Sequence, residues 1–82
     1  MITFEYTDTF SGEANYSWVK RHTITGQDWS LSVAKVIRRA KSWAGLTGCR
    51  CAKSDMGDYI ELRPSGSCTV LFITWEPDTE SI

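Results

Sequence analysis

The sequence predicts an α+β domain in which one amphipathic helix packs on one face of a mostly antiparallel sheet of four to five strands. Three observations support this prediction. Segments near both ends of the chain alternate apolar and polar residues, which is the period of a half-buried strand. A middle segment instead has its apolar residues at helical spacing. One helix on one sheet face covers all of these apolar stripes, in the order strand, strand, helix and then two or three strands.

The first two strands are expected to form a hairpin. Ile2, Phe4 and Tyr6 alternate with polar residues, so they mark a first strand with one buried face. Residues 15–25 are rich in aromatic and β-branched side chains, as strands are. The stretch TFSGEAN between them predicts a turn around Gly12.

The helix is the element with the clearest signals. The apolar residues at helical spacing are Val33, Val36, Ile37, Ala40 and Ala44, with Leu31, Ala34 and Trp43 widening or flanking the stripe. Asp28 or Ser30 is the predicted N-cap, because a short polar side chain satisfies free backbone amides at a helix start. Gly45 is the predicted stop, because glycine accepts a left-handed backbone.

The second half of the chain predicts two or three further strands. Residues 49–54 (CRCAKS) are a short candidate, residues 59–63 (YIELR) alternate cleanly, and the turns DMGD and PSGS separate the segments. Residues 68–75 (CTVLFITW) form an apolar run, which predicts a central strand. Residues 76–82 are an acidic tail that we expect to fray. We interpret residues 1–82 as a single domain.

Size and composition place the chain in the globular class. With 82 residues there is room for one modest core, and 41% hydrophobic residues are enough to form it. The longest uncharged apolar stretch, residues 68–75, is far shorter than the about 20 residues of a membrane span. The start of the chain, MITFEYTD, lacks the basic and apolar regions of a signal peptide. We therefore expect no membrane partner and a cytoplasmic location.

The cysteines form no recognisable disulfide or metal pattern. Three cysteines cannot all pair within one chain, so reduced thiols are expected. The available zinc ligands are Cys49, Cys51, Cys68 and His22. Four ligands are enough for a zinc site, but Cys49 and Cys51 are separated by one residue, whereas paired zinc ligands usually have about two to four residues between them. We interpret the cysteines as small apolar side chains in strands and expect no metal and no cofactor.

Catalytic side chains are not grouped in a way that favours an enzyme. Asp55, Asp58 and Glu61 flank a turn at Gly57, and carboxylates can act as acids and bases. Solvated acids are common in such turns, so this is the favoured interpretation. His22 paired with a cysteine lacks a third group to orient it. We therefore expect no catalytic residues and no enzyme.

Charge is unevenly distributed along the chain. The net charge is only −1, so it gives no general argument for nucleic-acid binding. Residues 20–53, however, hold eight Lys and Arg residues against Asp28, whereas the rest of the chain holds Arg63 against nine acids. Such segregation predicts a basic side and an acidic side that steer partners.

The predicted helix has a basic face. Lys35, Arg38, Arg39 and Ser42 lie at positions i, i+3, i+4 and i+7, opposite the apolar stripe. Two interpretations are open: a solvated surface whose bases suit the C-terminal half of a helix, or a docking surface for phosphates or for an acidic protein. The shortage of acids four residues from these bases favours docking.

Lys20 and Arg21 extend the basic segment into the predicted second strand. Tyr16 and Trp18 are predicted to lie on the same face of this strand, and Lys20 and His22 continue that face. Buried, these aromatics belong to the core, which is the favoured interpretation because four tryptophans are much of the apolar content. Exposed, they form a stacking platform for single-stranded nucleic acid, followed by charges that neutralise its backbone.

Three stretches, YTDTFSGEANYSWVKR, IRRAKSWAGLTGCRC and DMGDYIELRPSGSCTVLFI, resemble small proteins of bacteriophages, prophages and mobile elements. The resemblance brings no catalytic residues with it. Accessory phage proteins of this size, the anti-CRISPR proteins among them, commonly bind a host protein and block it stoichiometrically. The resemblance therefore implies a non-enzymatic accessory protein in the cytoplasm of a bacterial host, binding a host macromolecule and inhibiting a defence system such as CRISPR–Cas.

The alternative is a small nucleic-acid-binding module that uses the basic helix face with Tyr16 or Trp18. The residues that we expect to bind a partner are Lys20, Arg21, Lys35, Arg38, Arg39, Tyr16 and Trp18. The sequence leaves the oligomeric state open.

Overall fold

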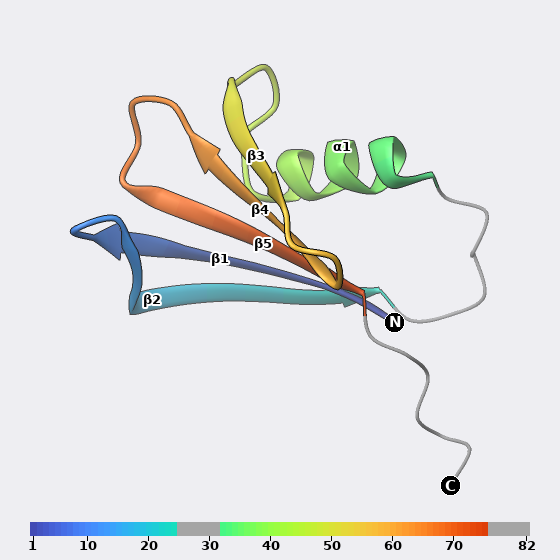
Figure 1. Cartoon of the computed structure of the whole chain (residues 1–82), viewed down its shortest axis with the longest axis horizontal. Helices are drawn as coiled ribbons and strands as arrows, with labels where there is room; N and C mark the ends of the chain where they lie inside the picture. The colour runs from blue at the N-terminus through green and yellow to red at the C-terminus, as the bar shows by residue number, and fades with distance from the viewer. Residues whose placement is uncertain (25–31, 76–82) are drawn as a thin grey trace, which may run out of the picture.

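Five strands and one helix make up the described part of the chain, residues 1–24 and 32–75 of a computed structural model (Figure 1). The elements are β1 (Ile2–Phe10), β2 (Glu13–Ile24), α1 (Val33–Trp43), β3 (Cys51–Asp55), β4 (Tyr59–Pro64) and β5 (Thr69–Trp75). The strands form one sheet in the order β2-β1-β5-β4-β3, and each neighbouring pair is antiparallel. The predicted α+β class and the predicted first hairpin are confirmed.

β5 is the central strand, as its apolar sequence predicts. It pairs with β1 on one side and with β4 on the other. Val70, Leu71 and Ile73 are all 0% exposed. Because consecutive residues of a strand point to opposite faces of the sheet, Val70 and Leu71 are buried on different faces. Burial on both faces explains the continuous apolar run of this strand.

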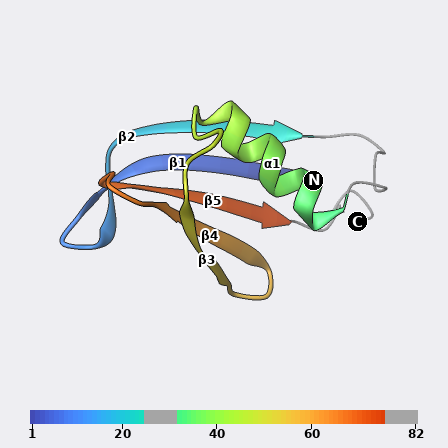
Figure 2. The ribbon, with the colours of Figure 1, turned by 90° about the horizontal axis from the view of Figure 1, so that it is seen from above.

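The core of the described residues lies between α1 and one face of the sheet (Figure 2). Val36 and Ala40 are the fully buried residues of α1. The strand residues in the same core cluster are Ile2, Phe4, Ile60, Leu62, Leu71 and Ile73. Burying one large aliphatic or aromatic side chain contributes about 1.5 to 3 kcal/mol. The contact between α1 and the sheet therefore stabilises the fold by removing these apolar side chains from water.

A serine caps the start of α1. The Oγ atom of Ser32 accepts a hydrogen bond from the backbone N–H of Lys35 over 3.2 Å, which satisfies an amide left free at the helix start. The described helix is thus capped by Ser32. The predicted caps, Asp28 and Ser30, lie outside the described residues, and so does the predicted tail at residues 76–82.

The end of α1 follows the prediction at Gly45, which has a φ of +76°. The N–H of Gly45 donates to the carbonyl of Ser42 over 3.2 Å, and the N–H of Leu46 donates to the carbonyl of Lys41 over 2.7 Å. These two bonds form a Schellman motif, in which the left-handed glycine reverses the chain. The reversal places Leu46 in the core beneath the helix, where it is 6% exposed.

Val33 does not belong to the buried stripe of α1, which corrects the prediction. Its side chain is 50% exposed. It lies in the first turn of the helix, beside an open hollow of about 240 Å³ lined by Val33, Asp55, Gly57, Ile60 and Trp75. Because the hollow opens to solvent, one side of the valine remains uncovered.

The tip of the β1–β2 hairpin is a two-residue turn. Ser11 and Gly12 have φ angles of 53° and 84°, and they connect the paired residues Phe10 and Glu13. Positive φ at both central residues defines a type I′ turn, whose twist matches that of the strands. The turn predicted around Gly12 is confirmed.

A bulge interrupts this hairpin opposite Asp8. The register between β1 and β2 shifts there. Thr7 pairs with Val19 but Thr9 pairs with Ala14, so residues 15–18 of β2 lie opposite the single residue Asp8. The carboxylate of Asp8 accepts hydrogen bonds from Asn15 Nδ2 over 3.0 Å, from the Ser17 N–H over 3.0 Å and from Ser17 Oγ over 2.6 Å. One side chain of β1 thus holds the residues on both sides of Tyr16.

The bulge turns Tyr16 and Trp18 to opposite faces of the sheet, so the predicted shared face is wrong. The Tyr16 hydroxyl donates to Glu5 over 3.1 Å on the face away from α1. The Trp18 ring lies edge-on to Tyr6 on the α1 side, with centroids 5.4 Å apart. The cause is the φ of +56° at Tyr16, which breaks the strand alternation. The favoured core placement is wrong too, because the two residues are 49% and 41% exposed.

The packing of α1 yields a first prediction, which compares two valines of one helix. Val36→Asp places a carboxylate without a partner at a fully buried position and costs several kcal/mol, about the whole stability of a small domain. Val33→Asp introduces the same charge at a half-exposed position of the same helix and should leave the fold intact. Thermal unfolding followed by circular dichroism measures both. Similar melting temperatures for the two variants would contradict this packing.

The Asp8 network yields a second prediction, on pH. Hydrogen bonds from Ser17 and Asn15 lower the pKa of Asp8 from 3.8 to about 2. Because this folded-state pKa lies below the unfolded one, the stabilisation is present above about pH 4 and is lost as pH falls through 2. Asp8→Asn should melt at a lower temperature at neutral pH and should lose less stability on acidification than the wild type. Parallel curves of melting temperature against pH for the two proteins would contradict the role of this carboxylate.

Candidate binding surface on the helix side

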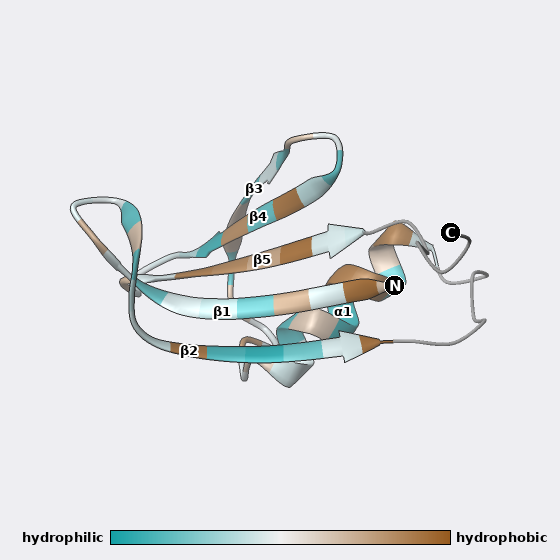
Figure 3. Cartoon of the chain, turned by 90° about the horizontal axis from the view of Figure 1, so that it is seen from below, coloured by the Kyte–Doolittle hydropathy of each residue, from teal (hydrophilic) through white to brown (hydrophobic). Residues whose placement is uncertain are grey.

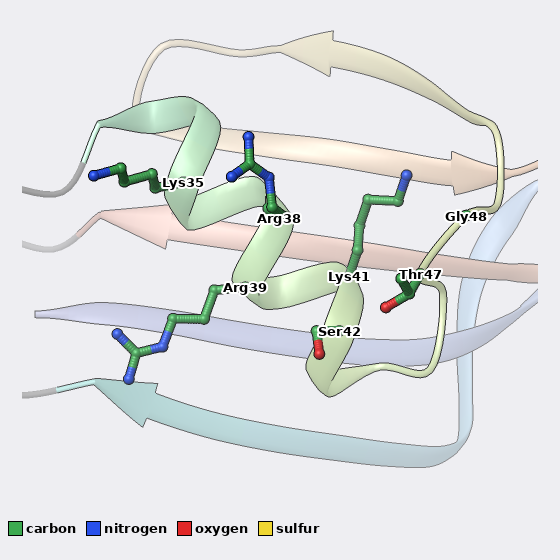
Figure 4. A pocket seen from close by; sticks show the side chains of 7 residues that line it. All are labelled: Lys35, Arg38, Arg39, Lys41, Ser42, Thr47 and Gly48. Carbon is green, nitrogen blue, oxygen red and sulfur yellow. The ribbon is translucent and has the colours of Figure 1, made fainter.

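The outward surface of α1 is basic and hollowed. Four cations of α1, together with residues of the loop that follows the helix, line a depression of about 580 Å³ (Figure 4). The lining residues are Lys35, Arg38, Arg39, Lys41, Ser42, Thr47 and Gly48. Because Val36 and Ala40 hold the other side of the helix on the sheet, these residues face away from the core. The basic face predicted for the helix therefore points outward.

These cations form no ion pair with an acid in the described part of the chain. The sequence of α1, VAKVIRRAKSW, contains no acid. Among the described residues, Lys35, Arg38 and Arg39 form no ion pair, whereas Lys41 Nζ donates to the carbonyl of Cys49 over 2.7 Å. Their charges are therefore available to an anionic partner. In Figure 4, Arg38 and Arg39 extend in different directions across the helix.

The strands that flank α1 add to this positive charge. Lys20 pairs with Tyr6, and Lys53 pairs with Leu62. Paired residues of neighbouring strands point to the same face, so both lysines lie on the α1 side of the sheet. Asp55 adds an acid to this side near the β3–β4 turn. The side that carries α1 nevertheless has an excess of positive charge; we call it the helix side.

Aromatic residues connect β2 with α1 on the helix side. The rings of Phe4, His22 and Trp43 form a triangle. The ring centroid of His22 is 6.0 Å from that of Phe4 and 6.1 Å from that of Trp43, and the centroids of Phe4 and Trp43 are 5.8 Å apart. Further along β2, Trp18 packs on Tyr6 but remains 41% exposed. An exposed tryptophan therefore lies on the same side of the sheet as the free cations of the helix.

The structure divides the residues that were predicted to bind a partner. Lys35, Arg38, Arg39, Lys20 and Trp18 lie on the helix side, but Arg21 and Tyr16 lie on the opposite face. Arg21 alternates with Lys20 along β2, and its Nε atom donates to Glu5 over 2.7 Å. The seven residues thus do not form a single surface.

Other members of the depression were not singled out from the sequence. Lys41 follows Arg38 by three residues, and this spacing within the basic helix was a usable signal. Thr47 and Gly48 are placed there by the chain reversal after α1. No sequence periodicity marks a loop that folds back beside a helix.

The cysteines and the turn acids do not form a site. Cys49 and Cys68 are exposed, Cys51 is partly buried, and all three are free thiols. Within residues 1–24 and 32–75, no group of three or more His, Cys, Asp or Glu side chains is arranged to hold a metal ion. Asp55 accepts a hydrogen bond from the Gly57 N–H over 3.0 Å, which stabilises the β3–β4 turn.

Comparison with protein-family models, with curated proteins and with solved structures finds no match to this chain. In the described residues, α1 is too short and too polar to cross a bilayer. We therefore infer the function from the chemistry of the surfaces.

Proposed function

We propose that this protein is a non-enzymatic binding protein whose helix side docks on an acidic surface of a partner protein. The observation that carries the proposal is the helix itself, because α1 contains no acid and four of its cations line one depression. Charge complementarity of this kind speeds encounter and fixes the orientation of a complex.

The details of the helix side favour a protein partner. The depression has room for protruding acidic side chains, and the hydroxyls of Ser42 and Thr47 add hydrogen-bonding groups to its lining. Trp18 is exposed on the same side, and tryptophan is enriched among the residues that dominate binding energy at protein interfaces. Cations on the same side of the sheet as an exposed aromatic residue suit a specific protein contact better than a diffuse one.

The resemblance to phage and mobile-element proteins supplies the biological context of this proposal. We place the protein in the cytoplasm of a bacterial host, where it acts as an accessory protein that binds a host protein stoichiometrically. Inhibition of a host defence system such as CRISPR–Cas is the proposed outcome of that binding. This part of the proposal is an analogy with a class of proteins.

Nucleic-acid binding is the second candidate function, and one observation favours it. Trp18 and Lys20 lie on the same side as α1, so a base stacked on the indole has phosphate-binding cations nearby. Tyr16 lies on the other face and adds nothing to such a platform. A single aromatic residue makes a weaker stacking surface than the sequence suggested, so the protein partner is preferred.

The third prediction reverses the charge of the helix side. The triple variant Lys35→Glu, Arg38→Glu and Arg39→Glu should keep its fold, because these side chains face away from the core and glutamate is a good helix former. Its affinity for a partner purified from host lysate should fall by about 100-fold or more, because like charges in an interface cost several kcal/mol.

The matched control keeps the charges and changes the side chains: Lys35→Arg, Arg38→Lys and Arg39→Lys. This variant should bind the partner with an affinity within about tenfold of the wild-type value, because each position keeps the positive charge that attracts an acidic surface. A folded triple-glutamate variant with undiminished affinity would exclude the helix side as the docking surface. The salt dependence separates the two candidate functions, because counterion release gives nucleic-acid complexes a steep linear slope of log affinity against log salt.

A further inference from the structure

Figure 3 shows the face of the sheet away from α1. This face carries a second recessed surface. A hollow of about 320 Å³ opens on this face, and no described helix lies over it. Its lining residues are Thr3, Glu5, Tyr16, Tyr59, Phe72 and Thr74, which come from four of the five strands. The lining is aromatic and contains a carboxylate, so its chemistry differs from that of the basic helix side.

Tyr16 is held at the edge of this hollow by a dedicated arrangement. A left-handed backbone, here with a φ of +56°, is unfavourable for a bulky residue. The carboxylate of Asp8 binds the residues on both sides of Tyr16 and so enforces this conformation. The Tyr16 hydroxyl then donates to Glu5 over 3.1 Å, and partial burial together with this bond raises the pKa of Tyr16. Its ring stands over the open face at 49% exposure.

Two carboxylates flank Phe72: Glu5 lines the hollow itself, and Glu61 lies next to it on the same face of the sheet. Glu5 of β1 and Glu61 of β4 are both in register with Phe72 of β5. Neighbouring strands lie about 4.8 Å apart, so the two glutamate Cα atoms are roughly 10 Å apart with the phenyl ring between them. Tyr59 meets the Phe72 ring edge-on, with centroids 6.1 Å apart. An aromatic ring is thus placed between two acids on an open surface.

Arginines orient both carboxylates without using all of their oxygen lone pairs. Arg21 Nε donates to Glu5 Oε2 over 2.7 Å, and Arg63 Nε donates to Glu61 Oε2 over 2.6 Å. The two glutamate side chains are only 23% and 15% exposed, so their positions are restricted. A carboxylate has about four acceptor sites, which leaves capacity for a further donor at each acid.

We propose that this hollow binds an arginine side chain of a partner polypeptide. A guanidinium group is planar, stacks on aromatic rings and donates hydrogen bonds to carboxylates in a fixed geometry. The ring of Phe72 offers the stacking surface, and Glu5 and Glu61 offer acceptors on either side of it. This site is independent of the proposed helix-side docking and selects the opposite charge.

The fourth prediction tests this site with small probes and nuclear magnetic resonance. The probe is acetyl-Gly-Arg-Gly-amide, and the control probe carries citrulline, which has the shape of arginine without its charge. At low salt the arginine peptide should cause saturable shifts of the ring resonances of Tyr16, Tyr59 and Phe72. The citrulline peptide should bind at least about threefold more weakly, since it lacks the cation–π and ionic contacts.

Variants of the full chain locate the binding. Glu61→Gln keeps the shape of the side chain and should lower the affinity for the arginine peptide by about threefold. Phe72→Leu removes the aromatic ring but keeps most of the apolar volume, and it should lower this affinity by about the same factor. If Phe72→Leu does not fold, Glu61→Gln carries the test alone. Arg38→Gln, on the helix side, should leave the response unchanged. Equal binding of both peptides, shifts confined to the helix side or no saturable response would overturn the proposal.

Discussion

The packing of Val36 and Ala40 against the sheet is the contact on which the rest of the structure depends. The sheet has two faces, but the described chain has one helix, so one face receives the core cluster and the other, on which Val70 is buried, has no described helix over it. Seating α1 on that core directs its basic residues outward. The same contact requires apolar residues at alternate positions of β1, β4 and β5. The residues between them point to the opposite face of the sheet, which we call the open face.

Two chemically different surfaces result from this one-sided core. The helix side has cations without acidic partners among the described residues, together with an exposed Trp18. The open face pairs its arginines with Glu5 and Glu61 and carries three aromatic rings in a hollow. The charge imbalance along the sequence thus becomes an imbalance between faces, although the open face is nearly neutral rather than acidic. We propose that the two faces select partners of opposite charge.

Periodicity predicted the elements that depend on local pattern. The alternation of Ile2 and Phe4, the apolar run of β5 and the helical spacing of Val36 and Ala40 were all readable, because burial on one face imposes them. Tyr16 was not predictable, since its left-handed backbone depends on hydrogen bonds from another strand. Its hollow was missed for the same reason, because the lining residues come from separate strands that only the register brings together. The exposure of Val33 depends on where the helix end lies over the sheet.

The central claim is that the two faces differ in electrostatic potential, and this can be measured without any partner. Nuclear magnetic resonance relaxation by a matched pair of cationic and anionic nitroxide probes reports the potential near each proton of the folded protein. Protons of Lys35, Arg38 and Arg39 should relax much faster with the anionic probe, because unpaired cations concentrate anions around α1. Protons near Phe72 should show no such preference or should favour the cationic probe. Equal ratios of the two relaxation rates on both faces would contradict the account.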